Sequence, residues 1–227
     1  ILPILRGERV LKEVELFFLP INDILMLQDE IIQNSKEILK LSGELPKIAQ
    51  KYCIREIMIN EITKSEGIEG VHTTKKDVYN SMNSTKIDRL SGIIKKYKQI
   101  TEKKIEKIDS AKEIRRIYDE IFGEEILINP ENRLDGKLFR KNSVFVTDGF
   151  KNIHLGDLTE EIILKHIEDL IKFTNRKDIS FLFKTCIAHY YFEYIHPFYD
   201  GNGRCGRMIF SMYLARKLDI FTGLSLS

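Results

Sequence analysis

Residues 181–217 constrain the fold most, because they predict two buried helices joined by one short loop. Residues 181–195 are apolar and aromatic at helical spacing. A proline follows at position 197, and the residue before a proline avoids the right-handed helical region. His196 is therefore expected to end the first helix, with its ring projecting into the loop.

The loop has the composition of an anion-binding turn. In the run Asp200-Gly201-Asn202-Gly203, the glycines allow backbone N–H groups to approach an anion at the start of the second helix. Helix N-termini attract phosphate. Arg204 and Arg207 are three residues apart on that helix and share a face, where guanidinium groups suit phosphate oxygens. The loop therefore predicts a polyphosphate site.

Two side chains of this segment point to its chemistry. Asp200 supplies a carboxylate oxygen, and one carboxylate shared with phosphate and water is a common way to hold Mg²⁺. His196 has an ordinary pKa near neutrality and is suited to remove a proton from an attacking hydroxyl. The segment predicts transfer of a phosphorus-centred group to an alcohol. The alternative is a structural helix–loop–helix with exposed arginines.

The segment from His196 to Arg207 resembles the motif of the Fic (filamentation induced by cAMP) domain family, H-P-F-x-[D/E]-G-N-[G/K]-R-x-x-R, at every fixed position. The resemblance implies an all-α, mainly helical Fic fold with a small β-hairpin flap. It also implies transfer of AMP from ATP, bound with Mg²⁺, to a Ser, Thr or Tyr hydroxyl of a target protein, with pyrophosphate released. The roles implied by position are catalysis by His196 and Arg204, metal binding by Asp200, and nucleotide binding by Phe198, Gly201, Asn202, Gly203, Arg204 and Arg207.

A second motif lies earlier in the chain. The run Ser65-Glu66-Gly67-Ile68-Glu69-Gly70 is similar to the inhibitory motif of the family, [S/T]-x-x-x-E-[G/N]. The resemblance implies that Ser65, Glu69 and Gly70 form an inhibitory element. In it, Glu69 pairs with Arg207 and stops the γ-phosphate of ATP from docking productively.

The residues themselves support a helix at this motif. Glu69 continues the helical face of Met58 and Ile62, and Gly70 suits a helix end. Gly67 is unfavourable, since glycine inside a helix costs about 1 kcal/mol relative to alanine. The alternative for Glu69 is a solvent-facing acid beside a capping glycine.

Residues 143–155 predict a β-hairpin, because two β-prone runs flank an Asp148-Gly149 turn. In the Fic family a hairpin at this place holds the target segment as an added strand. The resemblance therefore implies target docking by Val144, Phe145 and Val146. The alternative is a small hairpin that only covers the core.

Composition restricts the partners. Thirty-six Lys and Arg oppose 34 Asp and Glu, a net charge of +2, which gives no electrostatic case for nucleic acid or a membrane surface. The Lys-rich residues 95–107 are expected to form a solvated helix face. No apolar run approaches the length of a membrane-spanning helix. Three cysteines without metal-type spacing suit a reducing compartment, so we expect a cytoplasmic protein.

We expect an N-terminal helical segment with the inhibitory helix at 1–90 and a Fic catalytic core at 91–227. Helices are predicted over residues 23–41 and 45–69 and from Thr159 to about Phe173, with N-terminal caps at Thr74 and Ser110. Self-modification and oligomers are compatible with this organisation. The alternatives are removal of AMP or another phosphoryl or nucleotidyl transfer by the same site, and a nonenzymatic ATP-sensing regulator.

Overall fold

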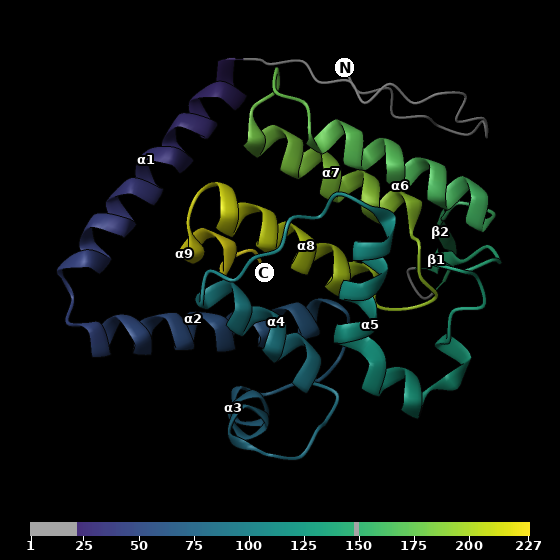
Figure 1. The fold of residues 1–227 in the computed structure, drawn as a ribbon, viewed down its shortest axis with the longest axis horizontal. Coiled ribbons are helices and arrows are strands. Elements are labelled where there is room, and N and C mark those ends of the chain that lie inside the picture. The colour runs from purple at the N-terminus through teal and green to yellow at the C-terminus, as the bar shows by residue number, and fades with distance from the viewer. Residues whose placement is uncertain (1–21, 148–149) are drawn as a thin grey trace.

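The computed structural model describes residues 22–147 and 150–227, and Figure 1 shows their arrangement. This part of the chain holds nine α-helices and one two-stranded antiparallel sheet, which confirms the mainly helical fold with a small hairpin. The helices are α1 (Asn22–Glu44), α2 (Lys47–Ile68), α3 (Lys75–Asn83), α4 (Ser91–Thr101), α5 (Ala111–Ile128), α6 (Glu160–Thr174), α7 (Phe181–Ile195), α8 (Asn202–Lys217) and α9 (Ile220–Gly223). A 3-10 turn (Pro130–Asn132) follows α5, and the strands are β1 (Phe145–Thr147) and β2 (Asn152–Leu155).

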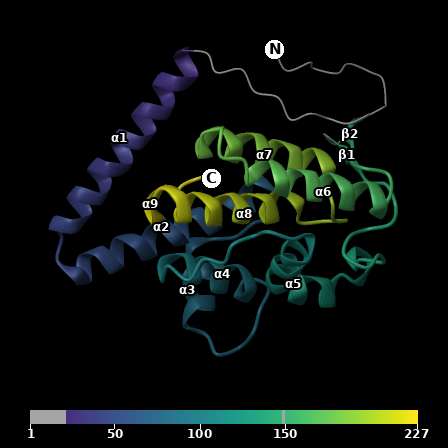
Figure 2. The same ribbon diagram turned by 45° about the horizontal axis from the view of Figure 1, so that its top comes forward.

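Helix α8 is the central element of the fold. Helices α6 and α7 lie on one side of it, and α2, α4 and α5 lie on the other (Figures 1 and 2). Cys205, Met208 and Met212 of α8 are buried in the same core as Ile62 of α2 and Ile117 of α5. The helix that follows the glycine loop is therefore held on several sides by the core.

Several helix ends follow from local sequence. Both predicted caps form, because Thr74 and Ser110 each complete a capping box, with Asp77 and Glu113 respectively. Helix α7 spans the predicted residues 181–195. Gly70 ends the inhibitory helix with a left-handed φ of 72°, as its N–H donates to the carbonyl of Gly67.

The expected solvated Lys-rich helix at 95–107 is only partly present, because Lys95 and Lys98 are exposed on α4 but Lys96 is buried and the helix ends at Thr101. Helix α4 buries Ile93, Ile94, Tyr97 and Ile100, so it belongs to the core. Lys96 is only 1% exposed, and its Nζ lies 2.7 Å from Glu120 Oε2 on α5. The half-buried carboxylate of Glu120 offsets the cost of taking the ammonium out of water, which the pattern of lysines alone did not reveal.

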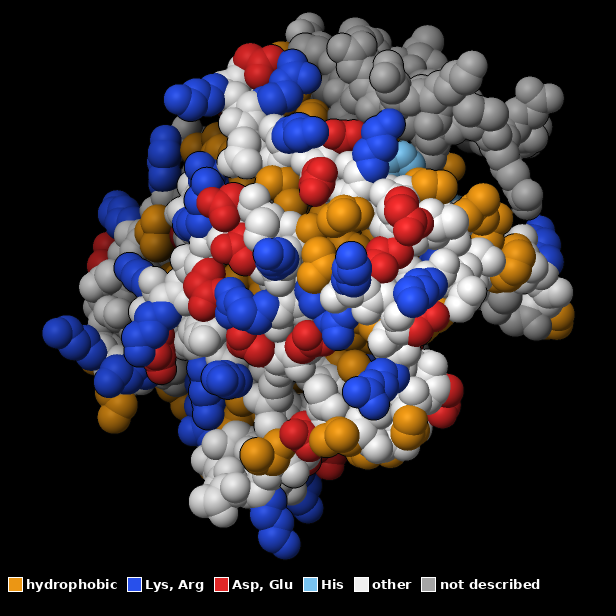
Figure 3. Space-filling view, turned by 45° about the vertical axis from the view of Figure 1, so that its right-hand side comes forward, with side chains coloured by type: hydrophobic (Ala, Val, Ile, Leu, Met, Phe, Trp, Pro, Cys, Tyr) orange, Lys and Arg blue, Asp and Glu red, His pale blue; other side chains and the backbone are white. Residues whose placement is uncertain are grey.

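Charges of both signs are distributed over the surface. Lys and Arg side chains alternate with Asp and Glu over the face shown in Figure 3, in agreement with the small net charge. No helix in residues 22–147 or 150–227 is both long and apolar enough to cross a membrane.

Candidate active site

His196 is fixed at the end of α7 in a left-handed conformation, with φ 53° and ψ 62°. Its backbone N–H donates to the carbonyl of Phe192 at 3.0 Å. On the ring, Nδ1 donates to the carbonyl of Glu193 at 3.2 Å. This contact assigns the ring proton to Nδ1 and leaves Nε2 as the acceptor of a neutral imidazole. The residue ends the helix as predicted and presents a base at its tip.

Burial lowers the pKa of His196. The hydrogen bond to the Glu193 carbonyl opposes this shift, whereas the positive charge of Arg140 and the neighbouring His154 add to it. The net direction favours the neutral ring, which is the form that accepts a proton.

Arg140 holds the base in place and was missed by sequence reasoning. The side chain is fully buried. Its Nε donates to the carbonyl of His196 at 2.8 Å, Nη1 to that of Asp157 at 2.7 Å, and Nη2 to that of Ile195 at 3.3 Å. A single arginine before a predicted hairpin carries no sequence pattern that distinguishes it from an exposed residue.

The start of the loop is closed by Asn202 and Phe198. The Asn202 amide brackets the Phe198 backbone, as Oδ1 accepts from its N–H and Nδ2 donates to its carbonyl, both at 2.9 Å. The Phe198 ring is fully buried and stacks on Tyr118 with centroids 3.7 Å apart. Both side chains therefore hold the loop, and nucleotide binding by these two residues stays a prediction.

Two glycines at the start of α8 lie close to side chains of other helices. Gly201 has a φ of 77°, and a Cβ there would lie 2.9 Å from the Phe122 ring. A Cβ on Gly203 would lie 2.1 Å from Glu69 Oε1. The carboxylate of Glu69 is thus packed directly on the helix N-terminus that the sequence predicted to bind an anion.

Asp200 is the predicted metal ligand. Its side chain is 57% exposed, and Oδ1 accepts from the N–H of Gly201 at 2.6 Å. Within the described residues, no three His, Cys, Asp or Glu side chains converge on a possible metal position. A lone, accessible carboxylate fits Mg²⁺, which keeps several waters and shares its site with substrate phosphates rather than occupying an all-protein cage.

Arg207 contacts the inhibitory motif, so the predicted pairing is present. Its Nη2 donates to Glu69 Oε1 at 2.7 Å and to the Ser65 carbonyl at 2.9 Å, while Nε donates to Ser65 Oγ at 2.9 Å. Ser65 and Glu69 stand four residues apart on the same face at the end of α2. The last turn of α2 therefore occupies the Nε and Nη2 donors of this guanidinium.

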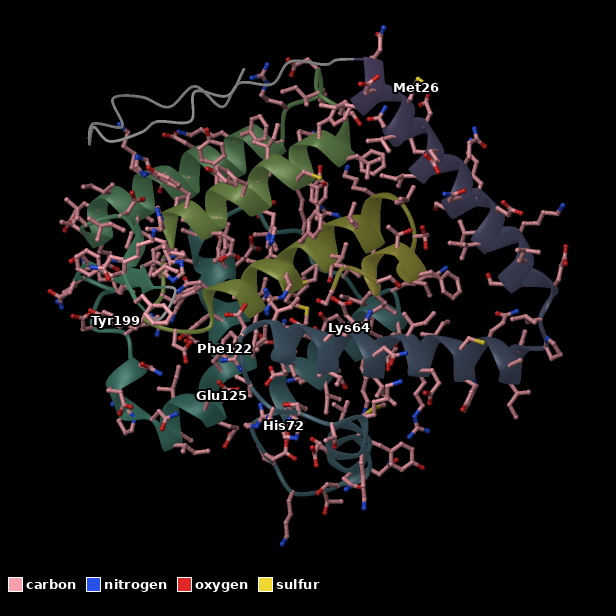
Figure 4. All side chains as sticks on the ribbon, turned by 180° about the vertical axis from the view of Figure 1, so that it is seen from behind. Met26, Lys64, His72, Phe122, Glu125 and Tyr199 are labelled. Atoms are coloured by element: carbon pink, nitrogen blue, oxygen red, sulfur yellow. The ribbon has the colours of Figure 1, made fainter. Side chains whose placement is uncertain are left out.

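Arg204 is held by two acids that sequence reasoning did not assign. Its Nη1 and Nη2 donate to the two carboxylate oxygens of Glu125 at 2.7 and 2.9 Å, and Nη1 also reaches Glu66 Oε1 at 3.3 Å. Its guanidinium lies over the Phe122 ring, and Figure 4 shows Phe122 and Glu125 together on α5. Burial opposes the charge of Arg204, but the bond to Glu125 and the nearby acids raise its pKa.

The hairpin lies against the base. Strands β1 and β2 pair Phe145 with Leu155 and Val146 with His154, and the predicted turn residues Asp148 and Gly149 fall outside the described residues. His154 Nε2 donates to the carbonyl of Tyr194 at 2.6 Å. Just beyond β2, a Cβ on Gly156 would lie 2.9 Å from the Cβ of His196. The chain therefore leaves the hairpin directly beside His196.

The fold and the site together define a class: a helical domain that presents a histidine base beside a glycine-rich, arginine-lined helix N-terminus. The family model described as Fic/DOC matches residues 107–214, which include α5, the hairpin and the whole loop. This match over residues 107–214 confirms the resemblance found in the sequence.

Curated relatives agree with this match, and a solved structure has the same fold. A protein adenylyltransferase Fic from Aedes aegypti is 30% identical over 185 residues, covering 74% of this chain and 34% of the relative. The Drosophila melanogaster protein of the same name is 27% identical and covers 71% and 33%. A crystal structure of a Fic family protein from Desulfovibrio desulfuricans G20 superposes with a TM-score of 0.70 at 21% identity, covering 92% of this chain and 62% of that one. The chain spans about a third of the length of these curated relatives.

Proposed function

We propose that this protein is a protein adenylyltransferase that transfers AMP from ATP to a Ser, Thr or Tyr hydroxyl of a target protein. The observation that carries the proposal is the free Nε2 of His196 beside the N-terminus of α8, which also displays Arg204 and Arg207. Relatives named protein adenylyltransferase Fic support the same activity.

In the proposed reaction, the target oxygen forms a bond to the α-phosphorus of ATP, and the bond from that phosphorus to the pyrophosphate oxygen breaks. His196 accepts the hydroxyl proton at Nε2. Backbone N–H groups of Asn202 and Gly203 hold phosphate oxygens at the helix N-terminus, while the N–H of Gly201 donates to Asp200. Asp200 would hold Mg²⁺, which supplies positive charge against the phosphates when bound.

The proposal includes autoinhibition by α2. The carboxylate of Glu69 lies on Gly203 and on the Nη2 of Arg207, where a terminal phosphate would be bound. An internal anion and an incoming phosphate compete for one site, so ATP is held in a less productive position while Glu69 stays. Glu66 extends this competition to Arg204.

Three further elements belong to the proposal. The target is held by main-chain pairing with the hairpin, near Val144, Phe145 and Val146, because this hairpin exits beside His196. Residues 1–90 act as the regulatory segment and residues 91–227 as the catalytic core. The protein acts in the cytoplasm, and one of its own hydroxyls can also serve as acceptor.

The test is intact-mass spectrometry after incubation with ATP and Mg²⁺, with and without a lysate of candidate targets. The variants are wild type, Glu69→Gly and Glu69→Gly/His196→Ala, with Glu56→Ala as a control that removes another acid of α2. An AMP-sized gain that is strong in the single variant and absent in the double variant is expected. A phosphate-sized gain, or removal of AMP from a modified target without any transfer, would replace the proposal with that reaction.

A further inference from the structure

Helix α1 carries an apolar row that no described element covers. Figures 1 and 2 show α1 along one edge of the molecule, joined to the body near α2 and α9. Leu27, Ile31, Ile38 and Leu41 on α1, and Leu45 just after it, are 40–57% exposed. With Asn34, these positions alternate in steps of four and three residues, which is the repeat of a coiled-coil seam. We call these six residues the α1 seam.

The α1 seam is distinct from the side of α1 that contacts the body. Ser35 is the buried residue of α1, and its Oγ donates to Asp219 Oδ2 at 2.5 Å, at the start of α9. Successive helical residues are 100° apart, so Ser35 points about a quarter-turn away from the seam. The body therefore occupies one flank of the seam and leaves the seam itself exposed.

The other flank of the α1 seam is acidic. Asp23, Glu30, Glu37 and Glu44 recur every seven residues and so form one row beside the apolar positions. All four are exposed, and none forms an ion pair with a residue in 22–147 or 150–227. In a coiled coil, charges at this flanking position select the partner helix and its direction.

The charges argue against a second copy of this chain as the occupant. An antiparallel second α1 would place this acidic row against its own copy, and like charges there are unfavourable. In a parallel pair, the acidic row of the second α1 would lie beside Ser35 of the first, and Ser35 is already buried against Asp219. Neither arrangement gives the acids a positive partner.

We propose that α1 is a docking helix for a partner protein, which contributes an amphipathic helix with an apolar stripe flanked by Lys or Arg at seven-residue spacing. The apolar stripe would pack on the α1 seam, and the basic row would lie along Asp23, Glu30, Glu37 and Glu44. The interaction is separate from the proposed catalytic site, since it uses no residue of the 196–207 loop.

The test uses two synthetic helical peptides with the same leucine and isoleucine stripe, one with lysine and one with glutamate at the flanking positions. Binding to the full chain is measured by fluorescence anisotropy in 0.15 and 0.5 M salt. The lysine peptide is expected to bind about tenfold more tightly than the glutamate peptide, and the difference should shrink at high salt. Glu30→Lys/Glu37→Lys should reverse the preference.

Ile31→Ser/Ile38→Ser should weaken binding of the lysine peptide at least about tenfold by removing apolar contact. The matched control Met26→Ser, on another face of α1, should leave this binding unchanged. Both substitutions change exposed residues, and circular dichroism checks that the fold is kept. Equal binding of the two peptides, or no binding of either at about 100 μM, would overturn the proposal. So would a dimer of the chain in light scattering that the seam substitutions dissolve, because a second copy would then be the occupant.

Discussion

The two ends of the loop between α7 and α8 are held by different kinds of contact. At the His196 end, Arg140 donates to backbone carbonyls and Asn202 brackets the backbone of Phe198. These partners are neutral parts of the main chain and are present in every state of the folded protein. Packing and hydrogen bonds of this kind fix the position of the base independently of any ligand.

At the other end, the guanidinium groups of Arg204 and Arg207 are bound by the carboxylates of Glu125, Glu66 and Glu69. A phosphate can replace a carboxylate on a guanidinium, because both anions have oxygen atoms that accept paired N–H hydrogen bonds. The His196 end thus has a permanent frame that needs no ligand, whereas at the other end we propose that phosphates of ATP exchange with the acids. The predictions below test that separation.

Replacing Arg140 should have the largest effect. Arg140→Met removes the donors to four backbone carbonyls and should lower the free energy of unfolding by about 3 kcal/mol. It should also abolish AMP transfer in a Glu69→Gly background, because the base loses its support. Urea denaturation followed by circular dichroism measures the first effect, with the exposed Arg133→Met as control. A denaturation midpoint of Arg140→Met equal to that of the wild type would show that Arg140 does not stabilise the His196 end of the loop.

Glu69→Gly should raise the rate of AMP transfer by about tenfold or more, because it frees Arg207 to bind phosphate. Removing about 1.4 kcal/mol of competition is enough for a tenfold change. Stability should fall by less than about 1 kcal/mol, because the ion pair is partly exposed. Initial rates of AMP incorporation and a denaturation curve test both parts. A large loss of stability would mean that the pair belongs to the permanent frame.

Glu66→Gln tests whether the second arginine also has an exchangeable acid. Glu66 is buried between Arg204 and Arg89, and Glu125 still binds Arg204 after the change. In the Glu69→Gly background we expect roughly a threefold further gain in kcat/KM for ATP, because one competing charge is lost. A lower kcat/KM would indicate that Glu66 positions Arg204 for catalysis rather than competing with phosphate.

The pH profile of the Glu69→Gly variant reports on the base. Burial lowers the pKa of His196 below the ordinary value of 6.5, so the neutral ring persists to lower pH. Activity should therefore fall only when the pH drops below 6.5, as the ring becomes protonated. An acidic limb of kcat/KM centred above 6.5 would contradict the assigned environment.

The smallest expected effect concerns Glu193, which lies on α7 near Arg207 and whose Oε1 has no hydrogen-bond partner among the described residues. Burial raises the pKa of Glu193 from 4.5 to about 7. The folded state therefore holds the proton more tightly than the unfolded state, and its stability falls as the pH rises from 4.5 to about 7. Glu193→Gln should raise the melting temperature by a few degrees at pH 8 and by less at pH 5. Equal shifts at both pH values would contradict this reasoning.

Local sequence determined where the elements of the site begin and end. Pro197 ended α7 at His196, the Thr74 and Ser110 caps started α3 and α5, and Gly70 ended α2 after Glu69. These features depend on the backbone preferences of a few adjacent residues, so they can be read without the fold. The family resemblance added the pairing of Glu69 with Arg207, which the structure contains.

Tertiary structure alone decided which distant groups share a partner. Arg140 meets a carbonyl 56 residues away, and Glu66 meets Arg204 across 138 residues. Packing likewise buried the Phe198 ring in the core and buried Lys96 against Glu120. Helical periodicity shows which side of an element is apolar but not which element covers it, and that choice depends on how all the helices pack around α8.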